Sequence, residues 1–308
     1  MEKFEVKKQR LKEALSGLEQ LLDEGQRLGL DLADAAQKLR SVVQSSEDET
    51  IRIVLLGSFS DGKTSAIAGL LGRLEDSMKI DQDESSDELK IYRPKDLKDG
   101  FEIVDTPGLF GTKEKETDGQ TMRYSEITER YISEAHIVIY VCHAVVPLKD
   151  SHKEIIRLVM RDFGKLDCSI FVINKMDEAG TDMLDADDYA EMAATKKKNL
   201  IQRLRDTILL TPEEEASLRI ACIAADPKGK GLAHWFARPD DYMKRSHIGL
   251  LRDYITEITE KKDAVALREN KNIAAVKDAM MQVEKEIFER ERLLSADLER
   301  SQEAMKEI

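Results

Sequence analysis

A lysine flanked by glycine and threonine follows the first long apolar run of this sequence. Residues 51–56 read IRIVLL, and residues 57–64 read GSFSDGKT. This spacing fits the pattern G-x-x-x-x-G-K-[ST], in which glycines let the backbone curl so that successive N–H groups point at phosphate oxygens. Lys63 offers a compact positive charge to phosphate, and Thr64 offers a hydroxyl to Mg²⁺, an ion that prefers oxygen ligands. The segment therefore predicts a phosphate-binding turn between a strand and a helix.

The helix that is expected to start near Thr64 adds the positive end of its dipole to this turn. The pattern alone also fits a glycine-containing turn between a strand and a helix that binds no phosphate, so its function depends on the motifs that accompany it. We expect Lys63 to be catalytic. The residues of the turn that we expect to contact a nucleotide are Gly57, Ser58, Ser60, Asp61, Gly62, Lys63, Thr64 and Ser65.

A second motif, FEIVDTPG, occupies residues 101–108. An aspartate at the carboxyl end of a strand is well placed to hold Mg²⁺ through water, so Asp105 is a candidate metal ligand together with Thr64. Gly108 leaves room for its N–H group to meet a γ-phosphate. Because that contact exists only while the third phosphate is present, Gly108 can act as a switch.

A third motif lies in CSIFVINKMDEAG, residues 168–180, where a predicted strand leads into Asn174, Lys175 and Asp177. A carboxylate accepts hydrogen bonds and cannot donate them. Guanine presents two donors on one edge, its ring N1–H and its N2 amino group, whereas adenine presents an acceptor there. Adenine facing Asp177 would leave buried polar groups unpaired, at a cost of about 1–3 kcal/mol for each group. The motif therefore predicts guanine as the base.

Composition and charge narrow the class of protein. The chain has 308 residues, 35% of them charged, and a net charge of −13. Such an acidic protein is not expected to bind nucleic acid, which needs a concentrated basic face. Residues 1–15 lack the apolar core of a signal peptide, and no stretch approaches the ~18–20 apolar residues that cross a bilayer. We therefore expect a soluble, cytoplasmic protein.

Glycine and proline usage divides the chain into three zones, residues 1–49, 50–248 and 249–308. Leucines at helical spacing predict a helical hairpin in the first zone. In the middle zone, β-rich runs alternate with amphipathic or polar segments, which predicts an α/β fold with a mostly parallel sheet flanked by helices. These runs are IRIVLL, ELKIYR, FEIVD, IVIYVCH, CSIFVI and RIACIA.

Residues 250–308 contain neither glycine nor proline and repeat apolar residues at helical spacing. As a single helix they would extend about 88 Å, whereas each arm of the N-terminal hairpin would span about 30 Å. Part of the apolar stripe therefore has no obvious partner, and it either pairs between chains or belongs to a longer protein. A break near residues 268–272 is the alternative.

The three motifs, in this order, resemble the G1, G3 and G4 signatures of translation-factor-class GTPases. Residues 219–226, RIACIAAD, resemble the strand and loop whose backbone touches guanine in that class, which implies contacts from Ala224 and Ala225. The resemblance covers roughly residues 50–260. It implies a P-loop GTPase domain that binds GTP and GDP with Mg²⁺ and hydrolyses GTP.

Two departures narrow the choice of GTPase. Such proteins carry a threonine in the first switch loop, but no threonine lies between Thr64 and Thr106, and Ser85 or Ser86 is the candidate substitute as a Mg²⁺ ligand. Small signalling GTPases place a glutamine after the glycine of the second motif to orient water, whereas Leu109 stands here. Because this chemistry is mainly positioning and charge stabilisation, a second protomer can supply the missing group.

The layout is similar to that of dynamin-family GTPases, and GSFSDGKTS with DESSDEL resembles the LeoA-like subgroup of bacterial dynamin-like proteins. Ser60 matches a serine of that family's P-loop and so joins Lys63 as a candidate catalytic residue, while Phe59 stands where classical dynamins have a catalytic glutamine. The resemblance implies self-association through the GTPase domain. It also implies a helical neck from residues 1–49, a neck and the start of a stalk from residues 249–308, and peripheral membrane contact in a full-length form.

Two other functions fit the same residues. A monomeric regulatory GTPase with coiled-coil arms would need an external activator. A helical scaffold with a guanine-nucleotide switch would bind GTP and hardly hydrolyse it, which the missing switch threonine favours.

Overall fold

The structure, a computed structural model, falls into two compact units, each with a hydrophobic core of its own. One unit spans residues 49–271, and the other combines residues 1–48 with residues 272–308. The residues that the structure describes are 2–44, 50–75, 78, 90–93, 101–106, 131–261 and 264–306.

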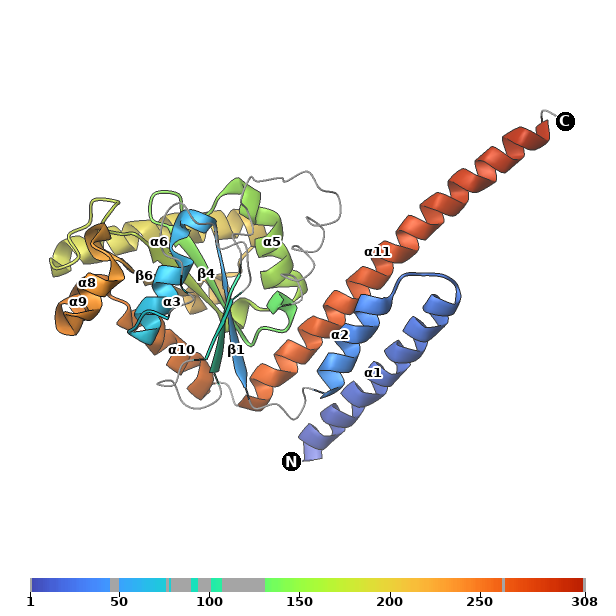
Figure 1. Ribbon diagram of the computed structural model, residues 1–308, viewed down its shortest axis with the longest axis horizontal. Coiled ribbons are helices and arrows are strands. Elements are labelled where there is room, and N and C mark those ends of the chain that lie inside the picture. Colours follow the sequence, from blue (N-terminus) through green and yellow to red (C-terminus); the bar gives the residue numbers. More distant parts are fainter. Residues whose placement is uncertain are drawn as a thin grey trace. The chain divides into compact units, whose positions relative to one another are not determined.

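Among these residues, six strands form one sheet in the unit of residues 49–271 (Figure 1). Their order is β2-β3-β1-β4-β5-β6, and every neighbouring pair is parallel except β2 with β3. The predicted α/β class with a mostly parallel sheet is confirmed, and each of the six apolar runs contributes a strand. The strands are β1 (Ile51–Leu56), β2 (Lys90–Tyr92), β3 (Phe101–Asp105), β4 (Ile137–His143), β5 (Ser169–Asn174) and β6 (Arg219–Cys222).

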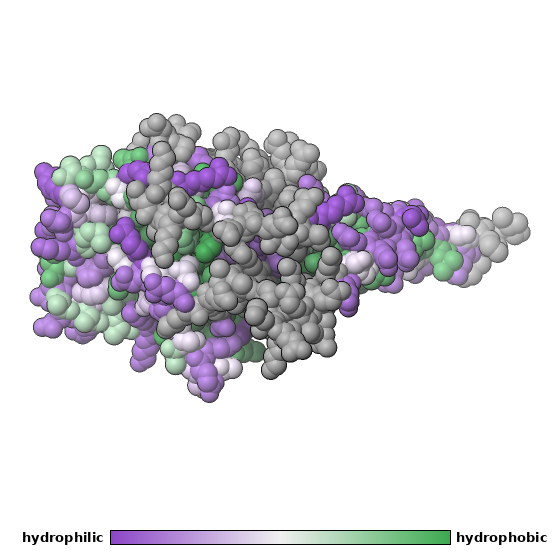
Figure 2. All heavy atoms as spheres, turned by 90° about the horizontal axis from the view of Figure 1, so that it is seen from below, coloured by the Kyte–Doolittle hydropathy of each residue, from purple (hydrophilic) through white to green (hydrophobic). Residues whose placement is uncertain are grey.

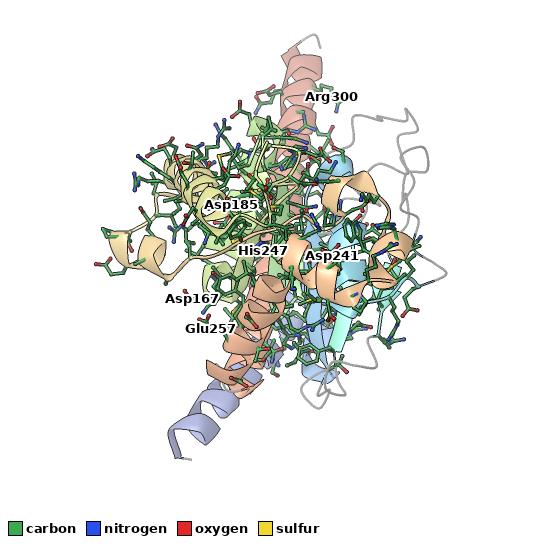
Figure 3. All side chains as sticks on the ribbon, turned by 90° about the vertical axis from the view of Figure 1, so that its left-hand side faces the viewer. Asp167, Asp185, Asp241, His247, Glu257 and Arg300 are labelled. Atoms are coloured by element: carbon green, nitrogen blue, oxygen red, sulfur yellow. The ribbon has the colours of Figure 1, made fainter. Side chains whose placement is uncertain are left out.

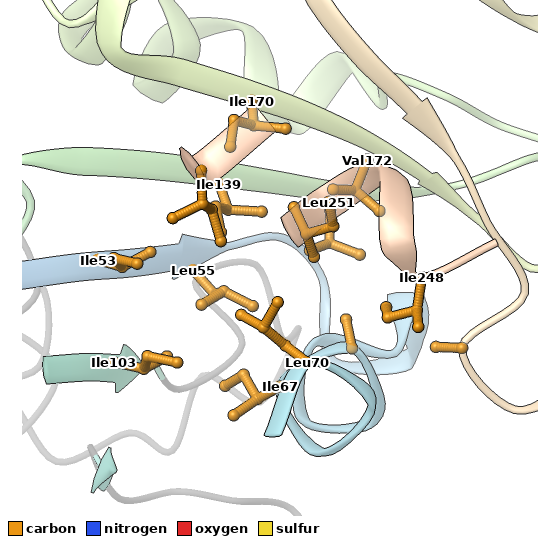
Figure 4. Packing of buried hydrophobic residues seen from close by; sticks show 14 of the residues in the cluster. Ile53, Leu55, Ile67, Leu70, Ile103, Ile139, Ile170, Val172, Ile248 and Leu251 are labelled. Carbon is orange, nitrogen blue, oxygen red and sulfur yellow. The ribbon is translucent and has the colours of Figure 1, made fainter. Parts of the chain in front are cut away.

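Helices pack on the sheet because its central strands are apolar on both faces. On one face, Ile53 and Leu55 of β1 lie in a cluster with Ile67 of α3 and Leu251 of α10 (Figure 4). The same cluster receives Trp235 of α8, which is buried. The helices that contribute to it are α3 (Lys63–Leu71), α8 (Leu232–Phe236), α9 (Pro239–Ser246), α10 (Gly249–Lys261) and, through Leu267, the start of α11 (Ala264–Lys306).

Alternate strand residues point to the opposite face of the sheet. Two helices, α5 (Lys153–Arg157) and α6 (Ala186–Ile208), pack against each other, and α6 also contacts β6. The carboxylate of Asp185 (Figure 3) starts α6 because it accepts hydrogen bonds from the backbone N–H groups of the second and third residues of the helix. A π-helical turn, Leu158–Asp162, follows α5, and the short helix α7 (Pro212–Ser217) precedes β6.

Arg219 joins two other segments to the start of β6. Its guanidinium donates to the backbone oxygen of Asp167, at 3.1 Å, and lies 3.4 Å from a carboxylate oxygen of Glu257 on α10. Asp167 and Glu257 lie near each other in Figure 3. These contacts hold α10 beside the amino end of β6, the end opposite to the predicted site.

The second unit contains a helical hairpin, as its leucine spacing indicated. The helices α1 (Glu2–Arg27) and α2 (Ala33–Gln44) are joined by a turn in which Gly29 has a φ of +85°. Their apolar faces form a core with two small residues of α11, Ala275 and Ala279. The buried members contributed by the hairpin are Leu15, Leu22, Leu32, Ala35, Ala36 and Leu39.

The helix α11 (Ala264–Lys306) continues through residues 268–272, so the break considered as an alternative does not occur. Its residues Val276 and Val283 pack against the hairpin core, whereas Phe288 is 70% exposed and Leu298 is 60% exposed. Figure 2 shows hydrophobic residues among hydrophilic ones along this part of α11. The later part of the apolar stripe therefore lies uncovered among the described residues.

Two further features concern the described parts of the chain. None of the helices described here combines the length and the apolar character that spanning a membrane requires. Cys142, Cys168 and Cys222 are buried, and no disulfide joins them.

One buried charge stands out at the end of the sheet away from the strand carboxyl ends. Lys165 is 1% exposed, and its ammonium donates to the backbone oxygen of Ala135 at 2.6 Å. Burial lowers the pKa of Lys165 to about 7, and the nearby charge of Lys271 acts in the same direction, while Cys168 opposes both. The unfolded chain, with an ordinary lysine, therefore binds more protons than the folded chain over the range between the two pKa values.

We expect the free energy of unfolding to rise from about pH 7 to about pH 10, because stability increases with pH wherever the unfolded state binds more protons. In Lys165→Met, the increase in unfolding free energy over this pH range should be smaller by a few kcal/mol. Chemical denaturation across that pH range measures it, with the exposed Lys198→Met as the control that keeps the full rise. An identical pH dependence in wild type and Lys165→Met would contradict the assignment.

Candidate nucleotide-binding site

The predicted site residues that the structure describes gather at the carboxyl ends of β1, β3, β5 and β6. In a parallel sheet these ends share one edge, where ligands of α/β proteins bind. The turn at residues 57–62 follows β1, Asp105 ends β3, and Asn174 ends β5. Gly108, Ser85 and Ser86 lie outside the described residues, so their predicted roles stay predictions.

Two glycines are required by the geometry of the turn. Gly57 has a φ of +148°, and a Cβ atom there would lie 2.2 Å from the backbone oxygen of Val141 on β4. Gly62 has a φ of +83°, and a Cβ atom there would lie 2.4 Å from the side-chain nitrogen of Asn174. Both the backbone conformation and the space therefore exclude a side chain.

Lys63 lies folded against the first half of the turn. It is 4% exposed, and its ammonium donates to the backbone oxygens of Gly57 and Ser58, at 3.0 Å each. Burial lowers the pKa of Lys63, while the negative charges of Asp105 and Asp61 raise it. The turn thus holds a buried cation with carbonyl groups that a phosphate could replace as partners.

Thr64 and Asp105 meet beside the lysine. The hydroxyl of Thr64 donates to one carboxylate oxygen of Asp105, at 2.6 Å. The other oxygen, Oδ1, is buried and accepts no hydrogen bond from any described residue. Burial raises the pKa of Asp105, whereas the charge of Lys63 and the hydrogen bond from Thr64 lower it. A hydroxyl and an unsatisfied carboxylate oxygen side by side suit a hard divalent cation such as Mg²⁺ or the water that it holds.

Asn174 ties three segments of this edge together. Its amide nitrogen donates to the backbone oxygen of Asp61, at 2.9 Å, and its amide oxygen accepts the N–H group of Ala225, also at 2.9 Å. Ala224 donates its N–H group to Ser246. The loop with Ala224 and Ala225 therefore lies beside the turn, and its contact with a base stays a prediction.

Asp177 has a partner that the motif did not reveal. Its carboxylate accepts the backbone N–H group of Lys228, at 2.5 Å, from the loop after β6. That loop is held by Asp226, whose carboxylate accepts the N–H group of Gly231, and by the indole of Trp235, which donates to Pro227. A guanine edge with two donors would meet a carboxylate that is already oriented by this loop.

The remaining predicted residues differ in their surroundings. Ser60 is exposed, whereas Thr64, Ser65, Lys175 and Asp177 are half-buried. The carboxylate of Asp61 is 1% exposed and bonds the N–H group of Ser58, so it belongs to the interior side of the turn. Sequence reasoning missed two residues that contact the turn, Lys149 and His152, because histidines and lysines without ligand spacing give no signal of their own.

A parallel sheet with this turn after β1, an aspartate at the end of β3 and an asparagine–aspartate pair after β5 defines a P-loop guanine-nucleotide-binding domain. Two family profiles match the chain. One, described as the dynamin family, covers residues 74–176, and the other, described as a dynamin-like helical domain, covers residues 210–308. The chain belongs to the dynamin family of GTPases, as its motifs indicated.

Solved structures agree with this family. The LeoA bacterial dynamin GTPase from ETEC is 42% identical over 96% of this chain, with a TM-score of 0.60. This chain spans 50% of the length of LeoA. None of the curated proteins matches the sequence.

Two more distant structures share the fold alone. Toc33 from Arabidopsis thaliana, in complex with GDP and Mg²⁺, is 15% identical, with a TM-score of 0.51, over 75% of this chain and 93% of its own. A member of an oligomerised bacterial dynamin pair, described as sensing and tethering membranes, is 16% identical, with a TM-score of 0.50, over 93% of this chain and 57% of its own.

We expect Gly62→Ala to destabilise the protein and to weaken nucleotide binding at least tenfold, because its methyl group would displace Asn174 from the turn. Gly72→Ala is the matched control, since Gly72 also has a positive φ, +67°, but no atom lies within 4 Å of the added Cβ. The control should lose only the backbone term of about 1–2 kcal/mol. Thermal melting and titration with GDP measure both effects, and equal binding by the two variants would refute the role of Asn174.

Proposed function

We propose that this protein binds GTP together with Mg²⁺ and hydrolyses it to GDP and phosphate. The observation that carries the proposal is that Lys63, the Thr64–Asp105 pair and Asn174 lie together at the carboxyl ends of the strands. Asp177 follows Asn174 by three residues, in the loop after β5. Family membership supports the same chemistry. The chain spans 50% of the length of LeoA, and we propose that it carries out GTP hydrolysis within a longer protein of this kind.

Each residue has a role in this proposal that follows from its chemistry. Lys63 leaves the carbonyl groups of Gly57 and Ser58 and pairs with the β- and γ-phosphates. Thr64 and Asp105 would hold Mg²⁺, which would neutralise phosphate charge when bound. Asp177 accepts the two donors of guanine, and Ser60, which is exposed on the turn, faces the phosphates.

Hydrolysis also requires a group that positions the attacking water. Leu109 follows the glycine of the second motif and has no polar atom for this task. We therefore propose that two copies associate through their GTPase domains and complete each other's sites. This association would move the helical segments of residues 1–49 and 249–308. Peripheral membrane contact, in a longer form of the protein, is part of the same proposal, and its support is the family and the distant bacterial dynamin pair described as tethering membranes.

Self-activation predicts that GTP turnover per molecule rises with protein concentration, because dimers form by mass action. Phosphate release measured across a hundredfold concentration range, alongside sizing in GDP and in a transition-state mimic, tests this. Constant turnover per molecule would favour the monomeric regulatory GTPase. Release no faster than that of a Lys63→Ala control at any concentration would favour the switch that hardly hydrolyses.

Asp177→Asn should weaken GTP binding by about 10- to 100-fold, because an amide cannot accept both guanine donors and one buried group is left unpaired. The same change should strengthen binding of xanthosine triphosphate, whose carbonyl at position 2 can accept from the amide. Competition titrations with both nucleotides measure the exchange. Unchanged preference for GTP in the variant would show that another residue reads the base.

A further inference from the structure

A cluster of buried polar groups lies against the interior side of the phosphate-binding turn. The hydroxyl of Ser58, a residue that is 7% exposed, contacts two side chains of the segment after β4. One is the ring of His152, with Nε2 2.9 Å from Ser58 Oγ, and the other is Lys149, whose ammonium donates to Oγ at 2.8 Å. The turn is therefore held by side chains from a segment about 90 residues further along the chain.

His152 is fixed from its other side as well. It is fully buried, and its Nδ1 lies 2.7 Å from the hydroxyl of Tyr140 on β4. Burial lowers the pKa of His152 to about 4 and raises the pKa of Tyr140, so both groups are neutral near pH 7. A neutral imidazole has one donor and one acceptor nitrogen, which lets it link Tyr140 to Ser58 in a single chain of hydrogen bonds.

Asp61 is the fourth residue of this cluster and contacts both Ser58 and Lys149. Its carboxylate accepts the N–H group of Ser58, at 2.9 Å, and its other oxygen lies 3.5 Å from the ammonium of Lys149. Because the carboxylate is 1% exposed, a buried negative charge without a cation nearby would be strongly unfavourable. Lys149, which is partly exposed, supplies one such cation, in addition to the nearby charge of Lys63, and it also donates to Ser58.

We propose that Ser58, Asp61, Lys149 and His152, together called the underside cluster, are positioning residues for phosphate binding. They fix the first half of the turn, so that its N–H groups are already oriented when a nucleotide arrives. Preorganised donors bind charge more tightly than donors that must reorganise, and supporting side chains with fixed partners provide this order. This inference rests on the proposed function, because it assigns these residues to the same phosphate site.

A purely structural role makes a different prediction. If the underside cluster only stabilised the fold, its removal would lower the melting temperature and leave nucleotide affinity unchanged in the folded fraction. If Ser58 and Lys149 act through the same turn, removing both should weaken binding hardly more than removing Ser58 alone.

The test compares dissociation constants of the full chain for GDP and for a non-hydrolysable GTP analogue, with melting temperatures measured in parallel. We expect Ser58→Ala and Lys149→Met to weaken both nucleotides by about tenfold or more. Lys149→Arg, which keeps the charge and the donor, should restore most of the affinity. The matched control is Ser169→Ala, which removes a buried hydroxyl bonded to the backbone oxygen of Lys165 at the opposite end of the sheet, and it should bind as wild type does.

Wild-type affinity in both Ser58→Ala and Lys149→Met would overturn this proposal and leave the proposed function standing. Equal losses in Ser169→Ala would also overturn it, because they would trace to general destabilisation. If Ser58→Ala fails to fold, the partly exposed Lys149→Met and its Lys149→Arg partner decide the question. Failure of the wild-type protein to bind any guanine nucleotide would overturn the proposed function, and this inference with it.

Discussion

The two hydrogen bonds of the Asn174 side chain fix the geometry on which the rest of the site depends. One holds the backbone of the phosphate-binding turn at Asp61, and the other holds the loop after β6 at Ala225. Because Asn174 ends a fully buried strand, it cannot move without disturbing the sheet. Gly62 completes this constraint, since any side chain there would meet the amide. Asn174 therefore links the turn that we propose to bind phosphate to the loop that we propose to contact the base.

The same edge concentrates buried charge, which is unfavourable unless each group finds a partner. The ammonium of Lys63 donates to backbone carbonyl groups, and the carboxylate of Asp61 contacts Ser58 and Lys149. The carboxylate of Asp105 accepts a hydrogen bond from Thr64, but its other oxygen accepts none from the described residues. Burial shifts the pKa values of Lys63 and Asp105 toward the neutral forms. A triphosphate would bring further negative charge to Lys63, and its cation would bring positive charge to the unsatisfied oxygen of Asp105, which gives a physical reason for the site to bind such a ligand.

Sequence patterns predicted the sheet because its strands are short, apolar on both faces and separated by polar segments; IRIVLL and IVIYVCH coincide with β1 and β4. They predicted a glycine-containing turn after the first strand, and the structure shows that the backbone requires glycine at Gly57 and Gly62, while phosphate binding by the turn stays a prediction. They did not predict the contacts of His152 and Lys228, since these residues reach the site through the folding of distant segments and have no characteristic spacing. The buried position of Lys165 escaped for the same reason, because a lone lysine in a polar segment is ordinarily solvated.

The central claim is that Lys63, Asp105 and Asp177 act on one magnesium-bound guanine nucleotide. Calorimetric titration of the wild-type chain with GTP and with ATP, each with Mg²⁺ and with a chelator, tests it most directly. The account predicts one GTP per chain, tighter binding with Mg²⁺, and ATP weaker by about tenfold or more, since adenine leaves at least one buried group unpaired. Equal affinity for the two nucleotides, or a preference for ATP, would contradict it.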